Sequence, residues 1–116
     1  MAYMLLIVEG VNDRRQRPTA QGQDCMARMQ AFAAELQAAG QVAAVESLST
    51  RATRIERRQN RTHRIDGPFA EAKEMIGGFF LLTCKTREEA LALAERCPAV
   101  EWATVEVREV GPCFED

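Results

Sequence analysis

The sequence predicts an α+β fold, in which a β-α-β unit, a hairpin and a second β-α-β unit follow one another. Segments rich in aliphatic residues alternate with two segments whose apolar residues recur at helical spacing. Two β-α-β units of this kind are typical of a ferredoxin-like sheet with both helices on one face. The length of 116 residues predicts a single domain, residues 1–116.

The first half of the chain predicts a strand, a loop, a helix and a second strand. Residues 3–9 are apolar on both faces of an extended chain, as in a central strand. Residues 12–22 predict a polar loop that runs into a helix from about Gln23, where Met, Phe and Leu recur every three or four residues. Gly40 is expected to end this helix as a C-cap, and residues 42–49 to form the second strand.

Residues 52–66 predict a hairpin for which two registers are possible. A two-residue loop would set Arg58 against Arg61 and place Ile55 and Ile65 on opposite faces. A three-residue loop pairs two apolar residues and two opposite charges: Ile55 with Ile65, Glu56 with Arg64 and Arg54 with Asp66. We favour the three-residue loop because such cross-strand pairs stabilise a sheet.

Asp66-Gly67-Pro68-Phe69 predicts a sharp change of direction after the hairpin. Gly67 precedes a proline and is therefore driven out of the helical region, and Pro68 has no backbone N–H to donate. Residues 71–74 are expected to make about one helical turn. Gly77-Gly78 is expected to break this turn before an apolar strand at residues 79–84.

The last third of the chain predicts a second helix and a final strand. Thr86 and Glu89 have the spacing of a capping box. Apolar residues then recur at helical spacing as far as Cys97, and Pro98 stops the helix. Residues 102–110 alternate as a half-buried strand does.

Composition argues against several classes of function. With 47% hydrophobic and 28% charged residues, the chain has the composition of a globular protein. A formal net charge of −2 argues against a nucleic-acid interface. The apolar run at residues 4–8 is too short to cross a membrane, and no basic segment precedes it, so we expect a cytoplasmic protein. The four cysteines form no Cys-x-x-Cys pair, which predicts free thiols with no metal site and no cofactor.

Motifs from the whole chain resemble the DGPF-domain proteins of the YCII-related family. They are Asp66-Gly67-Pro68-Phe69 with Glu71, Lys73 and Gly77-Gly78, together with Met4-Leu5-Leu6-Ile7, Arg96-Cys97-Pro98 and Val105-Glu106-Val107-Arg108. The resemblance implies a dimeric α+β barrel, in which the sheets of two copies pack face to face. Strands that are apolar on both sides in so short a chain also predict a homodimer.

The resemblance leaves two functions open. One is a non-catalytic ligand-binding or regulatory module of a bacterium, associated with an extracytoplasmic-function sigma factor. The alternative is a small-molecule enzyme with dehydrohalogenase-like or lyase-like chemistry around Asp66.

Four residues near the Asp-Gly-Pro-Phe motif form the candidate site. Asp66 and Lys73 are the candidate catalytic residues, and both are expected, with Arg54 and Glu71, to bind a small anionic or carbonyl metabolite. Each has an ordinary structural alternative. Asp66 can accept hydrogen bonds from the turn that follows it, and Glu71 and Lys73 can form a solvated surface.

Two other features, the single histidine and a cluster of arginines, are further candidates for a function. His63 is the only histidine, and it is expected to be exposed and not to meet Asp66, because residues three apart on a strand face opposite sides. Six arginines between residues 51 and 64 form a basic cluster that can attract an anion or an acidic partner. The cluster lacks the interleaved aromatic residues of a nucleic-acid interface.

Substitution of Asp66 separates its two interpretations. Asp66→Asn keeps an oxygen that can accept backbone hydrogen bonds, so we expect it to fold normally. Asp66→Ala removes that oxygen and is expected to cost about 0.5–2 kcal/mol, as loss of a helix cap does. We expect Asp66→Asn to weaken binding of anionic or carbonyl metabolites, measured with a metabolite panel beside thermal melting. A loss of melting temperature in Asp66→Asn as large as that in Asp66→Ala would contradict this expectation.

Overall fold

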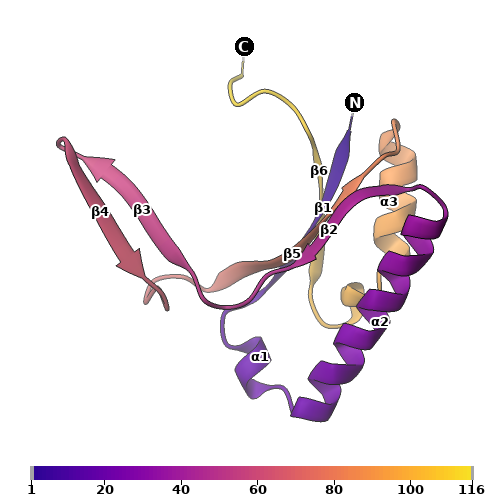
Figure 1. Cartoon of the computed structure of the whole chain (residues 1–116), viewed down its shortest axis with the longest axis horizontal. Coiled ribbons are helices and arrows are strands. Elements are labelled where there is room, and N and C mark those ends of the chain that lie inside the picture. Colours follow the sequence, from indigo (N-terminus) through magenta and orange to yellow (C-terminus); the bar gives the residue numbers. More distant parts are fainter. Residues whose placement is uncertain (1, 116) are drawn as a thin grey trace.

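Two separate antiparallel β-structures, one of four strands and one of two, are joined by the middle of the chain (Figure 1). The computed structural model describes residues 2–115. In chain order its elements are β1 (Tyr3–Gly10), α1 (Asp13–Gln16), α2 (Thr19–Ala38), β2 (Val42–Ser47), β3 (Thr53–Arg58), β4 (Arg61–Asp66), β5 (Glu74–Leu82), α3 (Arg87–Arg96), a 3₁₀ turn η1 (Pro98–Glu101) and β6 (Thr104–Glu109). The predicted α+β class is therefore confirmed.

The four-stranded sheet has the order β2-β5-β1-β6, and every neighbouring pair is antiparallel. The apolar strand β1 is central, as its two-sided sequence predicted. Leu5 of β1 lies opposite Phe80 of β5 on one side and Val107 of β6 on the other. These three side chains therefore share one face of the sheet.

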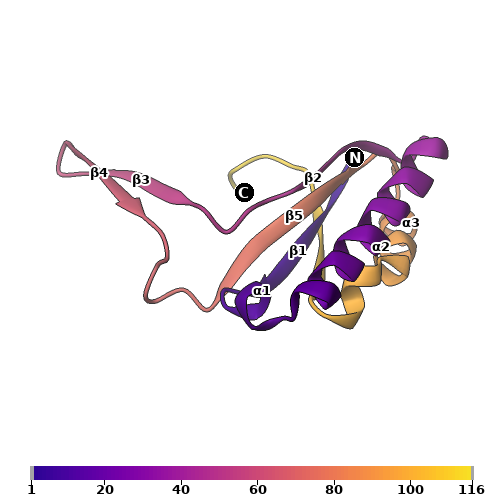
Figure 2. The ribbon, with the colours of Figure 1, turned by 60° about the horizontal axis from the view of Figure 1, so that its bottom comes forward.

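Helices α2 and α3 cover that face, and the core lies between the two layers (Figures 1 and 2). The largest fully buried side chains are Leu5, Leu36, Leu82 and Cys97. Thr86 caps α3 as predicted, because its Oγ1 accepts a hydrogen bond from Glu89 N. None of the helices in residues 2–115 is both long and apolar enough to cross a membrane.

Within residues 2–115, no helix lies on the opposite face of the sheet, and we call it the open face (Figure 2). Its apolar residues alternate with those of the core and are half-buried by their neighbours in the sheet: Met4, Leu6, Val8, Ala44, Phe79 and Leu81. The prediction that β1 is apolar on both sides thus corresponds to one covered face and one uncovered face.

The hairpin β3–β4 projects from the body, and we call residues 51–66 the arm (Figure 1). Every residue of the arm is exposed. The radius of gyration is 16.1 Å, whereas a compact chain of this length has about 13 Å. The arm therefore accounts for an extended outline that the rest of the fold does not require.

The predicted register of the arm is wrong. Ile55 lies opposite Arg64, and Arg58 lies opposite Arg61, so the loop contains only Gln59 and Asn60. Both loop residues have positive φ, at 53° and 61°. A two-residue turn of this kind matches the twist of the strands, and this gain outweighs charge pairing between side chains that water screens.

The segment after the arm also differs from the prediction. Residues 71–74 make no helical turn; a single hydrogen bond from Ala72 N to Phe69 O forms a turn, and β5 already begins at Glu74. Gly77 and Gly78 lie inside β5 and do not end an element. The register between β1 and β5 shifts beside them, so Gly77 occupies a β-bulge.

Helix boundaries differ in two places. Asp13–Gln16 forms α1 within the predicted loop, and α2 begins at Thr19 after Pro18, four residues before the expected start. Gly40 ends α2 with φ of 68°, as predicted, and Gln41 N donates to Leu36 O across it. A proline at the start and a glycine after the end are the residues that helices favour there.

Two glycines of the α2 region are expected to respond to alanine in opposite directions. A Cβ at Gly22 would meet nothing within 4 Å, so Gly22→Ala should stabilise the protein by about 0.5–1 kcal/mol, the helical preference of Ala over Gly. Gly40→Ala should destabilise it by about 1–2 kcal/mol, because it forces Cβ into the left-handed region. Urea unfolding measures both, and shifts of the same sign would refute the prediction.

Candidate functional site

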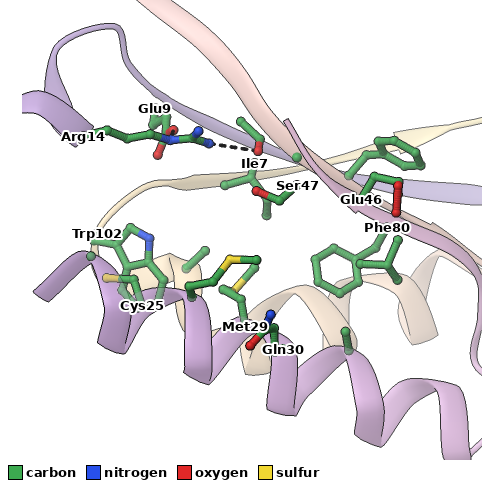
Figure 3. A pocket seen from close by; sticks show the side chains of 18 of the residues that line it. Ile7, Glu9, Arg14, Cys25, Met29, Gln30, Glu46, Ser47, Phe80 and Trp102 are labelled. Atoms are coloured by element: carbon green, nitrogen blue, oxygen red, sulfur yellow. Dashed lines mark hydrogen bonds and ion pairs between the residues drawn. The ribbon is translucent and has the colours of Figure 1, made fainter. Parts of the chain in front are cut away.

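A cavity of about 560 Å³ lies between α2 and the covered face of the sheet (Figure 3). Most of its wall is apolar and comes from both layers, including Ile7, Met29, Ala33, Val45, Phe80 and Trp102. Its polar lining includes Glu9, Arg14, Arg17, Gln30 and Ser47. The volume is in the range of cavities that hold small-molecule ligands.

Glu9 brings a carboxylate into this wall. Strand β1 alternates strictly between buried and half-buried positions, and Glu9 has the same parity as the core residues Leu5 and Ile7. It is only 5% exposed, and it is the buried charged residue of the described chain. A charge at such a position needs a fixed partner.

Arg14 is that partner, and it also binds two other segments. Its Nε donates to Glu9 Oε1 at 2.5 Å, its Nη1 to Leu48 O at 2.6 Å and its Nη2 to Gly77 O at 3.0 Å. The guanidinium thus joins β1, the end of β2 and the bulge of β5, and we call this arrangement the Arg14 clamp. Helix α1 holds it in position, since Asp13 Oδ2 accepts a hydrogen bond from Gly10 N.

The clamp explains the two glycines inside β5. A Cβ at Gly77 would lie 2.6 Å from Glu9 Oε1 and 2.7 Å from Arg14 Nη2. A Cβ at Gly78 would lie 2.9 Å from the carbonyl oxygen of Glu46 on β2. Glycine at both positions lets the ion pair and strand β2 approach the backbone of β5 closely.

The charged side chains and the sulfur-containing side chains lie in different parts of the cavity wall (Figure 3). Glu9 Oε1 accepts a hydrogen bond from Arg14 Nε, whereas no hydrogen bond to Glu9 Oε2 is found within residues 2–115. No fully buried polar side-chain atom there lacks a partner, so Oε2 is accessible. Across the cavity, Cys25 and Met29 of α2 lie near Trp102 (Figure 3). An apolar cavity whose wall contains a carboxylate oxygen free to accept a hydrogen bond can bind a ligand that has an apolar body and a hydrogen-bond donor.

The cysteines that burial affects do not suit nucleophilic chemistry. Cys97 is fully buried, and its Sγ lies 3.9 Å from Met29 Sδ. Burial raises the pKa of the Cys97 thiol, and burial together with Glu89 raises that of Cys84, so both favour the unreactive thiol. Cys25, Cys84, Cys97 and Cys113 are free, as predicted.

A second, wider hollow of about 1160 Å³ lies where the arm meets the body. Two predicted site residues meet at its edge: Arg54 Nη1 lies 3.2 Å from Glu71 Oε1, and the Arg54 guanidinium lies 3.8 Å from the centre of the Phe69 ring. Both partners of the ion pair are largely exposed. This arrangement fixes Arg54 on the motif segment.

Asp66 and Lys73, the other two candidates, are not brought together. Asp66 lies opposite Thr53 and not Arg54, and its Oδ1 accepts a hydrogen bond of 2.7 Å from Thr53 Oγ1. Both candidates are exposed; the backbone oxygen of Lys73 accepts a hydrogen bond from Val11 N. Neither lines the cavity below α2. Their catalytic and ligand-binding roles stay predictions.

His63 is exposed on the arm, as expected. It lies opposite Glu56, where the predicted register had placed it beside Arg57. Asp66 is paired with Thr53 three positions along the ladder, so the two residues face opposite sides. Within residues 2–115, no group of three His, Cys, Asp or Glu side chains is placed to hold a metal ion.

Glu9 and Arg14 were not predicted as site residues from the sequence. One signal was available: Glu9 continues the alternation of Leu5 and Ile7, and an arginine follows five residues later. The remaining partners could not be read from the sequence, because Leu48 and Gly77 lie 34 and 63 residues from Arg14.

Comparison with known families gives a match to this chain. The family model described as the YCII-related domain matches residues 1–113, a span that contains every helix and strand, both hollows and the arm. The resemblance predicted from the Asp-Gly-Pro-Phe motif and its accompanying segments is therefore confirmed at the level of the YCII-related family. A comparison with curated proteins finds no match.

Gly77→Ala tests the Arg14 clamp. Its Cβ would overlap Glu9 and Arg14, and overpacking of this kind costs about 1–3 kcal/mol. Gly111→Ala is the matched control, because a Cβ there would meet nothing within 4 Å. We expect urea unfolding to show a clear loss of stability for Gly77→Ala alone. Equal stability of the two variants would mean that the ion pair moves aside without cost.

Proposed function

The chain belongs to the YCII-related family, and from this premise we propose that it is a small-molecule-binding module whose ligand occupies the cavity between α2 and the sheet. The observation that carries the proposal is the cavity itself, about 560 Å³ with a buried carboxylate in its wall. The ligand has a compact apolar body and an N–H or O–H group that donates to Glu9 Oε2.

The shape and lining of the cavity support this ligand class. Ile7 and Phe80 from the sheet and Met29 from α2 offer an apolar surface to the body of the ligand. Arg14 cannot serve as a free cation for an anionic ligand, because its donors already bind Glu9 and two backbone oxygens. The buried charged partner that the wall offers is the Glu9 carboxylate, an acceptor, which favours a donor on the ligand; Arg17, which is half-buried, is a further charged group of the lining.

Binding is favoured over catalysis because, within residues 2–115, no base is hydrogen-bonded to Cys25, the thiol that lines the cavity. Cys25 lines the cavity, but the single histidine of the chain lies on the arm. An activated nucleophile needs such a base within hydrogen-bond reach. The enzyme alternative around Asp66 gains no support, since the Asp66 carboxylate already accepts from Thr53.

We further propose the finer architecture that the family resemblance implies. The order β2-β5-β1-β6, with α2 and α3 on one face, supports a ferredoxin-like single domain. The half-buried apolar side chains of the open face support a homodimer in which two sheets pack face to face. A cytoplasmic setting with an extracytoplasmic-function sigma factor as partner rests on the resemblance to DGPF-domain proteins.

Trp102 offers a direct test of the cavity, because it is the only tryptophan and it lines the wall. Small aliphatic and aromatic amines, amides and alcohols would be screened by thermal shift and then titrated while Trp102 fluorescence is followed. Gln30→Phe places a ring at the cavity, whereas Gln23→Phe places one on an exposed position of α2 outside it.

We expect at least one compound to raise the melting temperature and to change Trp102 fluorescence in the parent protein and in Gln23→Phe. Gln30→Phe should bind it at least tenfold more weakly, a loss of about 1.4 kcal/mol. Equal affinity in the two variants would place the ligand elsewhere and refute the proposal.

A further inference from the structure

The two faces of the arm differ in how their charges are satisfied. Residues that lie opposite each other in the ladder share a face. One face, which we call the Ile55 face, carries Thr53, Ile55, Arg57, Thr62, Arg64 and Asp66. The other carries Arg54, Glu56, Arg58, Arg61, His63 and Ile65.

Two of the three arginines on the second face, Arg54 and Arg58, have a carboxylate partner within residues 2–115, and Arg61 has none. Arg58 Nε lies 2.9 Å from Glu56 Oε1, and Arg54 Nη1 lies 3.2 Å from Glu71 Oε1. On the Ile55 face, neither Arg57 nor Arg64 has a carboxylate within 4.0 Å among residues 2–115. The Ile55 face thus presents two unpaired cations.

An apolar side chain lies between these cations. Ile55 is opposite Arg64, is two residues from Arg57 on the same strand, and is 66% exposed. An exposed large apolar residue beside unpaired arginines has the composition of a protein contact surface. An isolated two-stranded hairpin is at best marginally stable, so a surface that received this face would also stabilise the arm.

The body of the same chain offers a complementary surface. The arm carries six arginines and two carboxylates, a formal charge of +4, while the whole chain carries −2, so the remaining residues carry −6. On the open face, Leu6 and Phe79 lie side by side in one row. Glu46 of β2 flanks this row at one edge, and Glu106 of β6, whose carboxylate lies 4.0 Å from Arg108, flanks it at the other. An apolar centre with carboxylates at its margins matches the Ile55 face in both respects.

The arm and the helices lie on opposite sides of the sheet. Figure 2 shows α2 and α3 packed on one side of β1 and β5, with the arm extending beyond the end of the sheet on the other. The arm therefore leaves the body toward the space in front of the open face. A copy packed on that face would lie within its reach.

We propose that the Ile55 face of each arm docks at the margin of the open face of a second copy of this chain. Ile55 contacts apolar residues at the margin of the partner sheet, and Arg57 and Arg64 form ion pairs with the carboxylate at the edge that the arm reaches, Glu46 on β2 or Glu106 on β6. This inference rests on the homodimer proposed above and adds a reciprocal contact to it, so that each arm contributes cations to a surface of the other copy.

Charge reversal on the two faces of the arm tests the contact. Arg57→Glu/Arg64→Glu removes the cations of the Ile55 face. Arg58→Glu/Arg61→Glu is the matched control, since it lowers the net charge by the same amount at exposed arm positions that lie opposite each other on the other face. Dimer dissociation constants of both variants and the parent would be measured by sedimentation equilibrium at low and high salt, with melting curves to confirm folding.

We expect Arg57→Glu/Arg64→Glu to raise the dimer dissociation constant at least tenfold at low salt and the control to change it less than threefold. The difference should shrink at high salt, because ions screen exposed charges. A second chain carrying Glu46→Arg/Glu106→Arg should restore association when mixed with Arg57→Glu/Arg64→Glu, since the reversed charges again attract.

The experiment distinguishes a wrong homodimer proposal from a wrong arm contact. A parent protein that sediments as a monomer would refute the homodimer and the arm contact together. A parent dimer that both variants weaken equally, or that neither weakens, would leave the dimer standing and refute the arm contact. Weakening without rescue by the Glu46→Arg/Glu106→Arg chain would refute these carboxylates as the receiving surface.

Discussion

The junction of strands β1, β2 and β5 depends on the Arg14 guanidinium. Three donors on one side chain bind the end of β1, the end of β2 and the bulge of β5, which are far apart in sequence and must be held in register. Glu9 would otherwise be a buried charge without a partner, and such a charge is strongly destabilising. The clamp therefore makes it possible for a carboxylate to stand in the wall of an apolar cavity.

The same arrangement gives a physical reason for glycine at positions 77 and 78, which follow the Asp-Gly-Pro-Phe motif in the sequence. The sequence pattern predicted that these glycines end a helical turn. They lie instead in strand β5, where a side chain would displace Glu9, Arg14 or the backbone of β2. The segment that follows the motif therefore also forms part of the cavity wall, through Gly77 and Gly78. The segment from Asp66 to Glu71 shapes the base of the arm, while the glycines a few residues later admit the clamp.

Local signals predicted the elements well and long-range contacts poorly. The capping box at Thr86, the C-cap at Gly40 and the central position of β1 follow from spacing and backbone preference, and each is confirmed. The arm register failed because exposed charge pairs weigh less than the turn geometry at Gln59 and Asn60. The clamp escaped prediction because two of its three bonds span more than thirty residues.

The attachment of the arm divides the molecule into regions of unequal local stability. Its residues add nothing to the core cluster of residues 2–115, and a hydrogen bond from Gly67 N to Ala52 O closes its base. Opening β3 from β4 therefore exposes no core surface, whereas opening β1 from β5 disrupts the clamp, the cavity and the core at once. Backbone amides of a single protomer should accordingly exchange with solvent by two routes, a frequent local opening of the arm and a rare global opening of the sheet.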